Sequence, residues 1–472
     1  MNTKLSITAA LAAAGLITCA TSASAQCAGA PLGTGNNVYL TGSTAFRSVV
    51  FAALSNGKQA GGACAGALGT VFDTVGNNGA LANPITMGFS GGVTHTPATG
   101  SDNTVIFEGY IGGALYDIVC SWTGSEAGIA CVAGTTIANI RVPAHWNPDG
   151  SPSVQSTLKN LPGAPTKFLD KNAGPPYSAL EAATRQGDLS MADTSIASSL
   201  NSGAALTEYG AVGIVPFTYV KGKNSAPDAS WTDLVNVSHS QLLSFMAGTK
   251  PAAYFTGVVT DTDTCYLVGR NKGSGTRVNT MLDTTFFPSS PQQYSVQAWY
   301  DTNGVLNFTG NGTLAAPGNP SPMTNAPEQN PTGDGMDSGG FVAQEAQCDG
   351  LFNTNGIVIA YLGIGDAVTA RDGKGNAANP GGAVWLTLDG TAESNGAVQE
   401  GKYSYWGHEH LYGQVTPSVS ADTVAKALNG TTTGGVPAAI VNHGVAAQDT
   451  GIGIGAMHCD KPSSGDSGWP TR

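Results

Sequence analysis

The chain has 472 residues, a formal net charge of −12 and only 11% charged residues. Its length is sufficient for two domains, each with its own core. The acidic balance argues against nucleic acid as a partner, because phosphate backbones are bound by clustered Lys and Arg. A small anion is not excluded, since backbone N–H groups and one arginine in a cleft can hold it.

The first 25 residues have the pattern of a cleavable export signal. Lys4 precedes an apolar run from Leu5 to Thr18, and Ala23-Ser24-Ala25 supplies the small residues of a cleavage site. Cys19 follows Thr18, which fits a lipoprotein signal poorly. No later apolar run is long enough to span a bilayer, so we expect a mature chain without a transmembrane segment, in the periplasm or outside the cell.

The cysteines favour disulfide bonds, because exported proteins mature in oxidising compartments. No C-x-x-C pair occurs, which excludes a zinc ribbon or a thioredoxin-like motif. Spacing does not fix the connectivity of the cysteines that follow the signal. The preferred pairs, which leave Cys459 aside, are Cys27–Cys64, Cys120–Cys131 and Cys265–Cys348.

The first half of the chain predicts short strands separated by glycine turns and helices. A helix over 45–54 follows the capping residues of Thr41-Gly42-Ser43-Thr44. Residues 133–180 contain several prolines and predict irregular structure. The predicted strands cover 38–40, 114–119, 128–132, 189–192 and 213–220.

The second half repeats the same alternation. Ser238 and Gln241 form a capping box at the start of a helix that ends at Gly248. Strands are predicted over 265–268, 356–362 and 383–388, and residues 288–340 read as a long loop or insertion. Alternating strands, glycine turns and helices predict an α/β architecture.

The sharpest local signal is the strand that ends at Val268, followed by Arg270 and Gly273-Ser274-Gly275-Thr276. Small residues at a helix start let backbone N–H groups approach an anion. The two hydroxyls add donors, and Arg270 can bind two oxyanion oxygens at once. The alternative is an ordinary capped helix with a surface arginine.

Three earlier segments carry related chemistry. Gly42-Ser43-Thr44 starts a helix, and Gly124-Ser125-Glu126-Ala127-Gly128 is a hydroxyl-bearing loop. Asp193 follows a strand; a carboxylate beside an anion repels it unless the anion keeps a proton to donate. Each has a structural alternative, namely helix capping for Thr44 and Asp193 and a plain loop for Ser125.

Three other motifs imitate known sites. Ser464-Gly465-Asp466-Ser467-Gly468 is similar to a serine protease loop, but no matching histidine segment precedes it. His408-Glu409-His410 lacks the spacing that places two metal ligands on one helix face. His458-Cys459-Asp460 needs further ligands from elsewhere. We therefore expect no metal site and no enzymatic activity.

The order of the motifs resembles that of the phosphate-binding proteins of bacterial ABC transporters. The matching segments are Gly42-Ser43-Thr44, 124–128, Met191-Ala192-Asp193, 236–248, Arg270 with Ser274-Gly275-Thr276, 357–366 and 403–406. The chain departs from this pattern in longer segments over 55–120 and 132–193, in the added 288–340 segment, and in Arg47, which replaces a proline.

The resemblance implies a two-lobed periplasmic-binding-protein fold that binds phosphate, or a similar oxyanion, between its lobes for an ABC permease, without a cofactor. The implied domains are a signal over 1–25, a first lobe over 26–220 and 385–472, and a second lobe over 221–384. Crossovers near 218–222 and 383–401 would form the hinge. A secreted scaffold that keeps the fold without transport is the alternative. The implied ligand-binding residues are Ser43, Thr44, Ala45, Ser125 and Asp193 from the first lobe, and Arg270, Ser274, Gly275 and Thr276 from the second.

Overall fold

The fold is taken from a computed structural model that describes the parts of the chain on which the site and its supporting sheet depend. The described residues are 36–55, 88–90, 93–95, 104–111, 114–135, 142–143, 158–159, 186–295, 299–300, 306–307, 321–322, 335–336, 338–347, 356–374, 380–430, 435–437, 440, 451–461 and 470.

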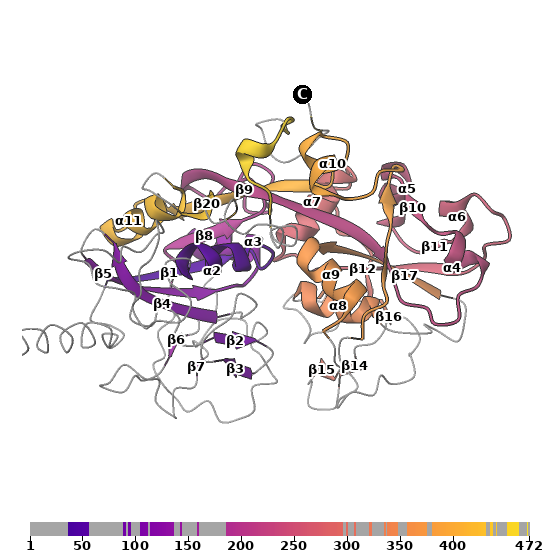
Figure 1. The fold of residues 1–472 in the computed structure, drawn as a ribbon, viewed down its shortest axis with the longest axis horizontal. Coiled ribbons are helices and arrows are strands. Elements are labelled where there is room, and N and C mark those ends of the chain that lie inside the picture. Colours follow the sequence, from indigo (N-terminus) through magenta and orange to yellow (C-terminus); the bar gives the residue numbers. More distant parts are fainter. Residues whose placement is uncertain are drawn as a thin grey trace, which may run out of the picture.

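One mixed sheet of 12 strands runs through the described part of the molecule (Figure 1). Parallel pairs join β1 to β5 and β8, and β12 to β17, while β9 and β20 pair antiparallel with each other. The strand order is β11 (Lys250–Pro251), β12 (Thr264–Val268), β17 (Gly356–Gly363), β9 (Leu206–Lys221), β20 (Trp406–Gln414), β8 (Leu189–Ala192), β1 (Asn36–Gly42), β5 (Ala114–Ser121), β4 (Thr104–Ile111), β2 (Gly88–Ser90) and β3 (Val93–His95), with β18 (Val384–Trp385) beside β9.

The long strand β9 joins two lobes. Its residues 206–216 pair with β20 in the first lobe, and its residues 217–221 pair with β17 in the second. In Figure 1 the strand crosses from the group around β1 and β8 to the group around β12 and β17. The two-lobed α/β fold is therefore confirmed. The chain passes between the lobes within β9 and again before β20, and the exact domain limits stay a prediction.

Helices cover both lobes. In the first lobe they are α2 (Arg47–Ser55), α3 (Ser125–Val132) and α11 (Val419–Leu428). In the second they are α4 (Ala229–Asp233), α5 (His239–Phe245), α6 (Ala253–Thr256), α7 (Gly275–Asp283), α8 (Gly339–Ala346) and α9 (Ile364–Asp372). Helix α10 (Asn395–Gln399) lies in the segment that precedes β20, and a short 3₁₀ turn, η5 (Ile454–Ala456), lies near the C-terminus. The small two-stranded sheets are β6 (Val142–Pro143) with β7 (Leu158–Lys159), β10 (Asn236–Val237) with β19 (Thr387–Leu388), β13 (Tyr294–Ser295) with β16 (Ser321–Pro322), and β14 (Trp299–Tyr300) with β15 (Leu306–Asn307).

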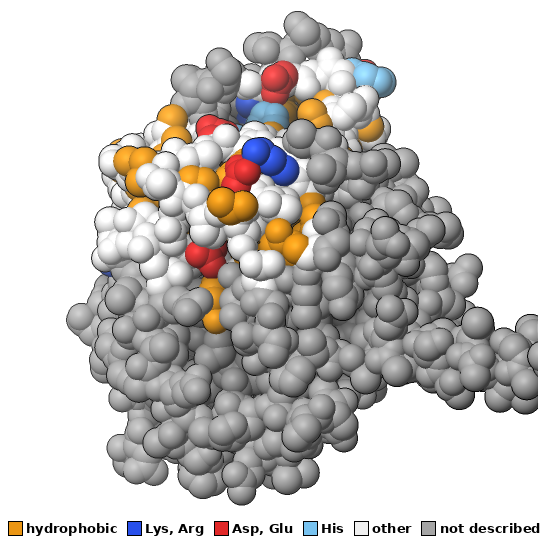
Figure 2. Space-filling view, turned by 90° about the vertical axis from the view of Figure 1, so that its left-hand side faces the viewer, with side chains coloured by type: hydrophobic (Ala, Val, Ile, Leu, Met, Phe, Trp, Pro, Cys, Tyr) orange, Lys and Arg blue, Asp and Glu red, His pale blue; other side chains and the backbone are white. Residues whose placement is uncertain are grey.

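Apolar burial fixes these elements in place. In the second lobe, Val342 of α8 and Ala367 of α9 pack with Val358 and Leu362 of β17 in one buried cluster. On the side of the first lobe seen in Figure 2, apolar side chains appear in small separate groups among neutral polar surface, with few charges between them. This surface agrees with the low charged fraction of the sequence.

Most predicted elements are confirmed. Strands β1, β8, β12 and β17 lie where they were expected, and the Ser238 capping box is formed at the start of α5. The predicted strand over 128–132 is wrong, because this segment belongs to helix α3. Its four apolar residues are all buried, so the sequence carries no amphipathic period there that would distinguish helix from strand.

The predicted disulfide pairs are not found where they can be checked. Cys120 and Cys131 are buried free thiols that form no disulfide with each other. Cys131 lies in α3, and its sulfur accepts a hydrogen bond from Gly187 N at 3.1 Å. Cys265 is also a buried thiol, so the pair with Cys348 is wrong for this structure. Burial raises the pKa of the Cys120 and Cys265 thiols. The pair Cys27–Cys64 lies outside the described residues.

Several other expectations also fall on residues that are not described, namely the export signal, most of the 288–340 segment and the 464–468 motif. Among the helices that are described, none has both the length and the apolar character required to cross a bilayer.

Asp263, just before β12, generates a test of this part of the fold. Burial raises the pKa of this carboxyl to about 6, with a hydrogen bond and charge from Asp228 and the charge of Asp261 adding to the effect. An acid whose pKa is raised by folding destabilises the folded state above that pKa, and the penalty disappears below its unfolded value of about 3.9. We expect Asp263→Asn to raise the Tm by a few degrees, about 2–4 °C per kcal/mol gained, at neutral pH but not at about pH 4. Thermal unfolding at both pH values measures this, with exposed Asp233→Asn as the control; an equal effect at both pH values would contradict the assignment.

Candidate functional site

Three parallel strands of the first lobe deliver their following loops to one edge of the sheet. β1 ends at Gly42, β5 at Ser121 and β8 at Ala192, and the carboxyl ends of parallel strands are where α/β folds place binding residues. Backbone hydrogen bonds hold the loops together: Ser43 N donates to Met191 O at 2.8 Å, and Gly124 N donates to Gly42 O at 2.8 Å. Thr44, Ser125 and Asp193 thus start from a shared, rigid base.

Glycine is required where these loops cross. At Gly128, inside α3, a Cβ atom would lie 2.4 Å from Ser190 Oγ and 2.6 Å from Gly42 Cα. The helix can therefore approach β1 and β8 closely only because this position has no side chain. The glycine that the sequence suggested as part of a loop is a helix-packing residue.

Glu126 anchors the same loops from behind. Its carboxylate is 2% exposed and accepts hydrogen bonds from Thr194 Oγ1 at 2.8 Å, Ser199 Oγ at 2.6 Å, Leu200 N at 2.9 Å and Asn201 Nδ2 at 3.1 Å. Burial raises the pKa of this carboxyl, and the four donors oppose the rise. Because Glu126 and Thr194 each follow a site residue, the network fixes Ser125 relative to Asp193.

In the second lobe, the Arg270 loop follows β12. The guanidinium Nε donates to Met336 O at 3.2 Å, and Arg270 N donates to the Tyr361 hydroxyl at 3.0 Å. Tyr361 in turn donates to Gln293 Oε1 at 2.7 Å, and Gln293 Nε2 donates to Arg270 O at 3.0 Å. The arginine is 2% exposed, so its direction is set by a buried hydrogen-bond network.

Helix α7 begins directly after this loop. Ser274 is its N-cap residue, but the Ser274 side chain makes no capping hydrogen bond. The first N–H groups of a helix have no partner within the helix, and they carry its positive dipole end. The start of α7 therefore offers backbone donors that its own cap residue does not use.

The two half-sites meet at Gly275. A Cβ atom on Gly275 would lie 1.5 Å from Asp193 Oδ1 and 2.8 Å from Ser125 Cβ, so the α7 backbone lies directly against the Asp193 carboxylate. Ser125 Oγ donates to the same Oδ1 at 2.5 Å. Across the interface, Arg270 Nη1 donates to Thr44 Oγ1 at 3.4 Å, and Ala127 N donates to Gly273 O at 3.2 Å.

Asn279 adds a direct link between the lobes. Its Nδ2 donates to Asp193 O at 2.5 Å and to Gly275 O at 3.1 Å, one turn back in α7. It therefore ties the backbone of both residues at the meeting point. Nothing in the sequence distinguished this asparagine from a surface residue of the helix.

The structure brings together five of the nine residues expected in the site: Thr44, Ser125, Asp193, Arg270 and Gly275. Ala45 follows Thr44 and faces the second lobe, where a Cβ on Gly363 would be 3.5 Å from its Cβ. Ser274 and Thr276 are buried at the start of α7. Ser43 Oγ is buried without a hydrogen-bond partner among the described residues. Sequence reasoning missed Glu126, Tyr361, Gln293 and Asn279, which support the site from behind.

The remaining motifs do not join this site. His408 pairs with Asp460 at 3.1 Å and His410 with Glu208 at 3.0 Å, both between ring nitrogens and carboxylate oxygens. Within the described residues, no cluster of three or more histidine, cysteine or acidic side chains has a geometry suited to a metal ion.

A bulkier residue at Gly275 tests the meeting point. We expect Gly275→Ala to keep each lobe folded but to force the start of α7 away from Asp193, because the new methyl group would overlap the carboxylate. Small-angle X-ray scattering should then give a larger radius of gyration than the wild type. Gly396→Ala is the matched control, since a Cβ there meets nothing within 4 Å; an unchanged radius for Gly275→Ala would contradict the contact.

Comparisons with known proteins give structural similarities only. No protein-family model matches the sequence, and the curated proteins contain no match. A solved structure from Clostridium perfringens, described as a candidate phosphate ABC transporter substrate-binding protein with bound phosphate, is 11% identical, with a TM-score of 0.37, 89% of this chain covered and 100% of that one.

Two further structures have similar descriptions. A possible phosphate-binding protein from Planctomyces limnophilus is 9% identical, with a TM-score of 0.31, 80% of this chain and 82% of that chain covered. An ABC-type phosphate transport receptor from Vibrio cholerae is 11% identical, with a TM-score of 0.30, 55% and 79% covered. These TM-scores are low, so the fold and the site rest on the contacts of this chain itself.

Proposed function

We propose that the protein captures phosphate, or a closely similar oxyanion, between its two lobes. One observation carries this proposal: the buried Arg270 and the uncapped start of α7 in the second lobe meet the hydroxyls of Thr44 and Ser125 and the carboxylate of Asp193 in the first. A cation, helix N–H groups and hydroxyls all favour a negatively charged ligand rich in acceptor oxygens.

Each group has a role in this proposal. Arg270 and the first N–H groups of α7 bind oxyanion oxygens from one side, and the Thr44 hydroxyl donates a hydrogen bond from the other. Ser125 donates to the anion when its hydroxyl turns away from Asp193. Because the ligand contacts both lobes, its binding favours the closed arrangement over the open one. Binding of this kind breaks no covalent bond and needs no catalytic base.

Asp193 supplies the selectivity. A carboxylate repels a fully ionised anion, but it accepts a hydrogen bond from an oxyanion that still carries a proton. At neutral pH phosphate keeps a proton and sulfate does not. The proposal therefore assigns preference for phosphate to Asp193.

The site suits uptake or sensing outside the cytoplasm. We propose that the exported protein passes the anion to a membrane permease of the ABC type. The surface-scaffold alternative has no support from a specific contact, and it predicts that no oxyanion binds.

Removal of the arginine tests the anion site. We expect Arg270→Ala to raise the Kd for inorganic phosphate by about 100-fold or more, because two charge-assisted hydrogen bonds are worth about 3 kcal/mol. Isothermal titration calorimetry of the purified protein measures the loss. Arg371→Ala is the control, since Arg371 is half exposed and pairs with Asp372. Phosphate binding that survives Arg270→Ala unchanged would rule out this site.

The carboxylate is tested by its effect on selectivity. We expect Asp193→Asn to lower the ratio of phosphate affinity to sulfate affinity by about tenfold or more, since the amide can donate to sulfate, whereas the carboxylate repels it. Competition titrations with both anions give the ratio. Asp188→Asn, at the opposite end of β8, is the control. An unaltered ratio would remove the selective role of Asp193.

A further inference from the structure

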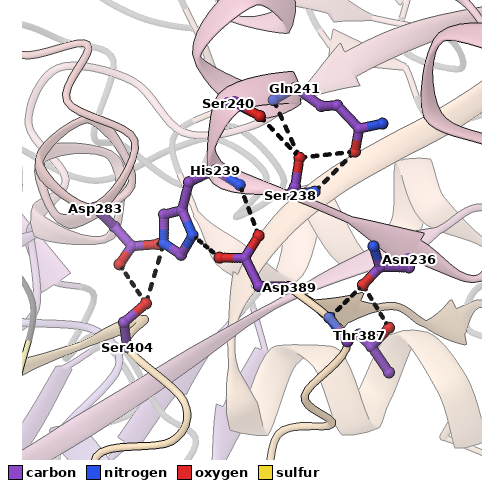
Figure 3. Close-up of polar contacts among 10 residues, drawn as sticks. Asn236, Ser238, His239, Ser240, Gln241, Asp283, Thr387, Asp389 and Ser404 are labelled. Atoms are coloured by element: carbon purple, nitrogen blue, oxygen red, sulfur yellow. Dashed lines mark hydrogen bonds and ion pairs between the residues drawn. The ribbon is translucent and has the colours of Figure 1, made fainter.

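A second polar cluster lies at the C-terminal end of α7, the helix whose N-terminal end belongs to the proposed anion site. His239 starts α5, Asp283 ends α7, Asp389 follows β19, and Ser404 lies in the segment that leads into β20. Figure 3 shows the imidazole between the two carboxylates, with the Ser404 hydroxyl beside it. Four segments that are distant in the sequence are thus joined by one side chain.

The contacts use both ring nitrogens. His239 Nδ1 contacts Asp389 Oδ2, and Nε2 lies 3.0 Å from Asp283 Oδ2 and 3.0 Å from Ser404 Oγ. Ser404 Oγ donates to Asp283 Oδ1 at 3.0 Å. A neutral imidazole has a single N–H, so the ring donates to both carboxylates only when it is doubly protonated and cationic.

This arrangement superficially resembles a Ser–His–Asp catalytic triad, but the protons are in the wrong places. In such a triad the histidine must accept the serine proton at Nε2. When the ring is doubly protonated, Nε2 has no lone pair to accept a proton, and the serine hydroxyl donates to Asp283 instead. Ser404 is 5% exposed. The cluster therefore binds structural segments together and does not activate a nucleophile.

The charges of His239 and Asp283 compensate each other at two helix ends. A cation at the start of a helix and a carboxylate at the end of a helix are each unfavourable to the helix dipole, and His239 and Asp283 occupy these positions. Their contact offsets both costs. Asp389 takes a backbone conformation with φ 49°, which few residues other than glycine adopt, and there its carboxylate also accepts from His239 N at 3.3 Å.

The segment after Ser404 leads directly to the anion site. Tyr405 shares a hydrogen bond with Thr280 of α7, and Phe217 N of β9 donates to Tyr405 O. Gly407 of β20 lies against Asn279 and Asp193 O. Three positions of α7 thus contact β20 or the segment before it. Asp283 at the end of the helix contacts Ser404, Thr280 in the middle contacts Tyr405, and Asn279 near the site lies against Gly407.

We propose that His239 is a pH-sensitive clamp that fixes the C-terminal end of α7 to the segment around Ser404, which leads into β20. The clamp thereby holds the N-terminal end of α7 in the orientation that binds the anion. Below the pKa of the ring, both N–H groups bind their carboxylates. Above it, one ring nitrogen loses its proton, its lone pair faces a carboxylate oxygen, and one of the two attractions becomes a repulsion. The effect on anion binding rests on the proposed function, whereas the clamp itself does not.

The surrounding groups set the direction of the pH effect. Burial lowers the pKa of His239, but the hydrogen bonds and charges of Asp283 and Asp389 outweigh this and raise the pKa above its ordinary value. The nearby phenols of Tyr219, Tyr403 and Tyr405 have pKa values raised by burial, so they stay neutral, and Glu393 acts on Tyr403. Since folding raises the histidine pKa, the clamp contributes its full stability below about pH 6.5 and loses it as the pH rises through the folded-state value.

Two variants of the full chain test the clamp. We expect His239→Gln to lower the Tm by about 2 °C or more at about pH 6 and by much less at about pH 9. The variant loses the stabilisation that the cationic ring provides at the lower pH, whereas at the higher pH the wild-type ring is already largely neutral. We expect Asp389→Asn, which removes the more exposed carboxylate, to lower the pKa of His239 in an NMR titration of the imidazole. His458→Gln is the matched control, since this ring is exposed and pairs only with Glu400 among the residues described. A Tm loss in His239→Gln that is equal at both pH values would overturn the clamp.

The link to the anion site has its own readout. The ratio of the inorganic phosphate Kd of His239→Gln to that of the wild type should be about fivefold at about pH 6 and near one at about pH 9; the ionisation of phosphate cancels in this ratio. A ratio that does not change with pH would overturn the coupling while leaving the clamp in place. If neither protein binds phosphate at any pH, the proposed function fails, and the Tm comparison still decides the clamp.

Discussion

The structure depends on one close contact, in which the backbone at Gly275 lies directly against the Asp193 carboxylate. The contact joins a helix start in one lobe to a strand end in the other, and it leaves no room for any side chain. Ser125 fixes Asp193 by donating to its carboxylate, and Asn279 donates to the backbone carbonyls of both Asp193 and Gly275. A helix start carries positive charge, so an aspartate beside it is favourable before any ligand enters.

The sheet explains why these residues can meet. Strand β9 belongs to both lobes, and β20 runs beside it into the first lobe. The lobes therefore share a continuous hydrogen-bonded ladder instead of a loose linker. Parallel strands on each side of this ladder end towards the interface, and their loops carry the polar residues. A bend of a few residues in β9 and before β20 would be enough to change the distance between the loops.

Much of this arrangement was predictable from sequence, because it depends on local chemistry. Glycines and hydroxyls after apolar strands indicated the loops at Thr44, Ser125 and Gly275, and the capping box of α5 was predicted from two residues. Helix α3 was missed because its apolar residues are buried on every side and carry no period. Tyr361, Gln293, Asn279 and Glu126 could not be found because each acts on a residue far away in the chain. The disulfide pairs at Cys120 and Cys265 were wrong because composition indicates the compartment in which a chain matures, and not which sulfurs meet.

Helix α7 connects these observations, since its two ends face different chemistry. Its start presents backbone donors and Arg277 to the interior near Arg270, and its end carries Asp283 against the charged ring of His239. A short α-helix moves as a rigid body, so a change of contact at one end changes the position of the other end. The positive end lies at the proposed anion site, and the negative end lies against His239, whose pKa is raised by Asp283 and Asp389. Coupling between protonation and anion capture thus needs no long pathway, only a helix of nine residues held at both ends.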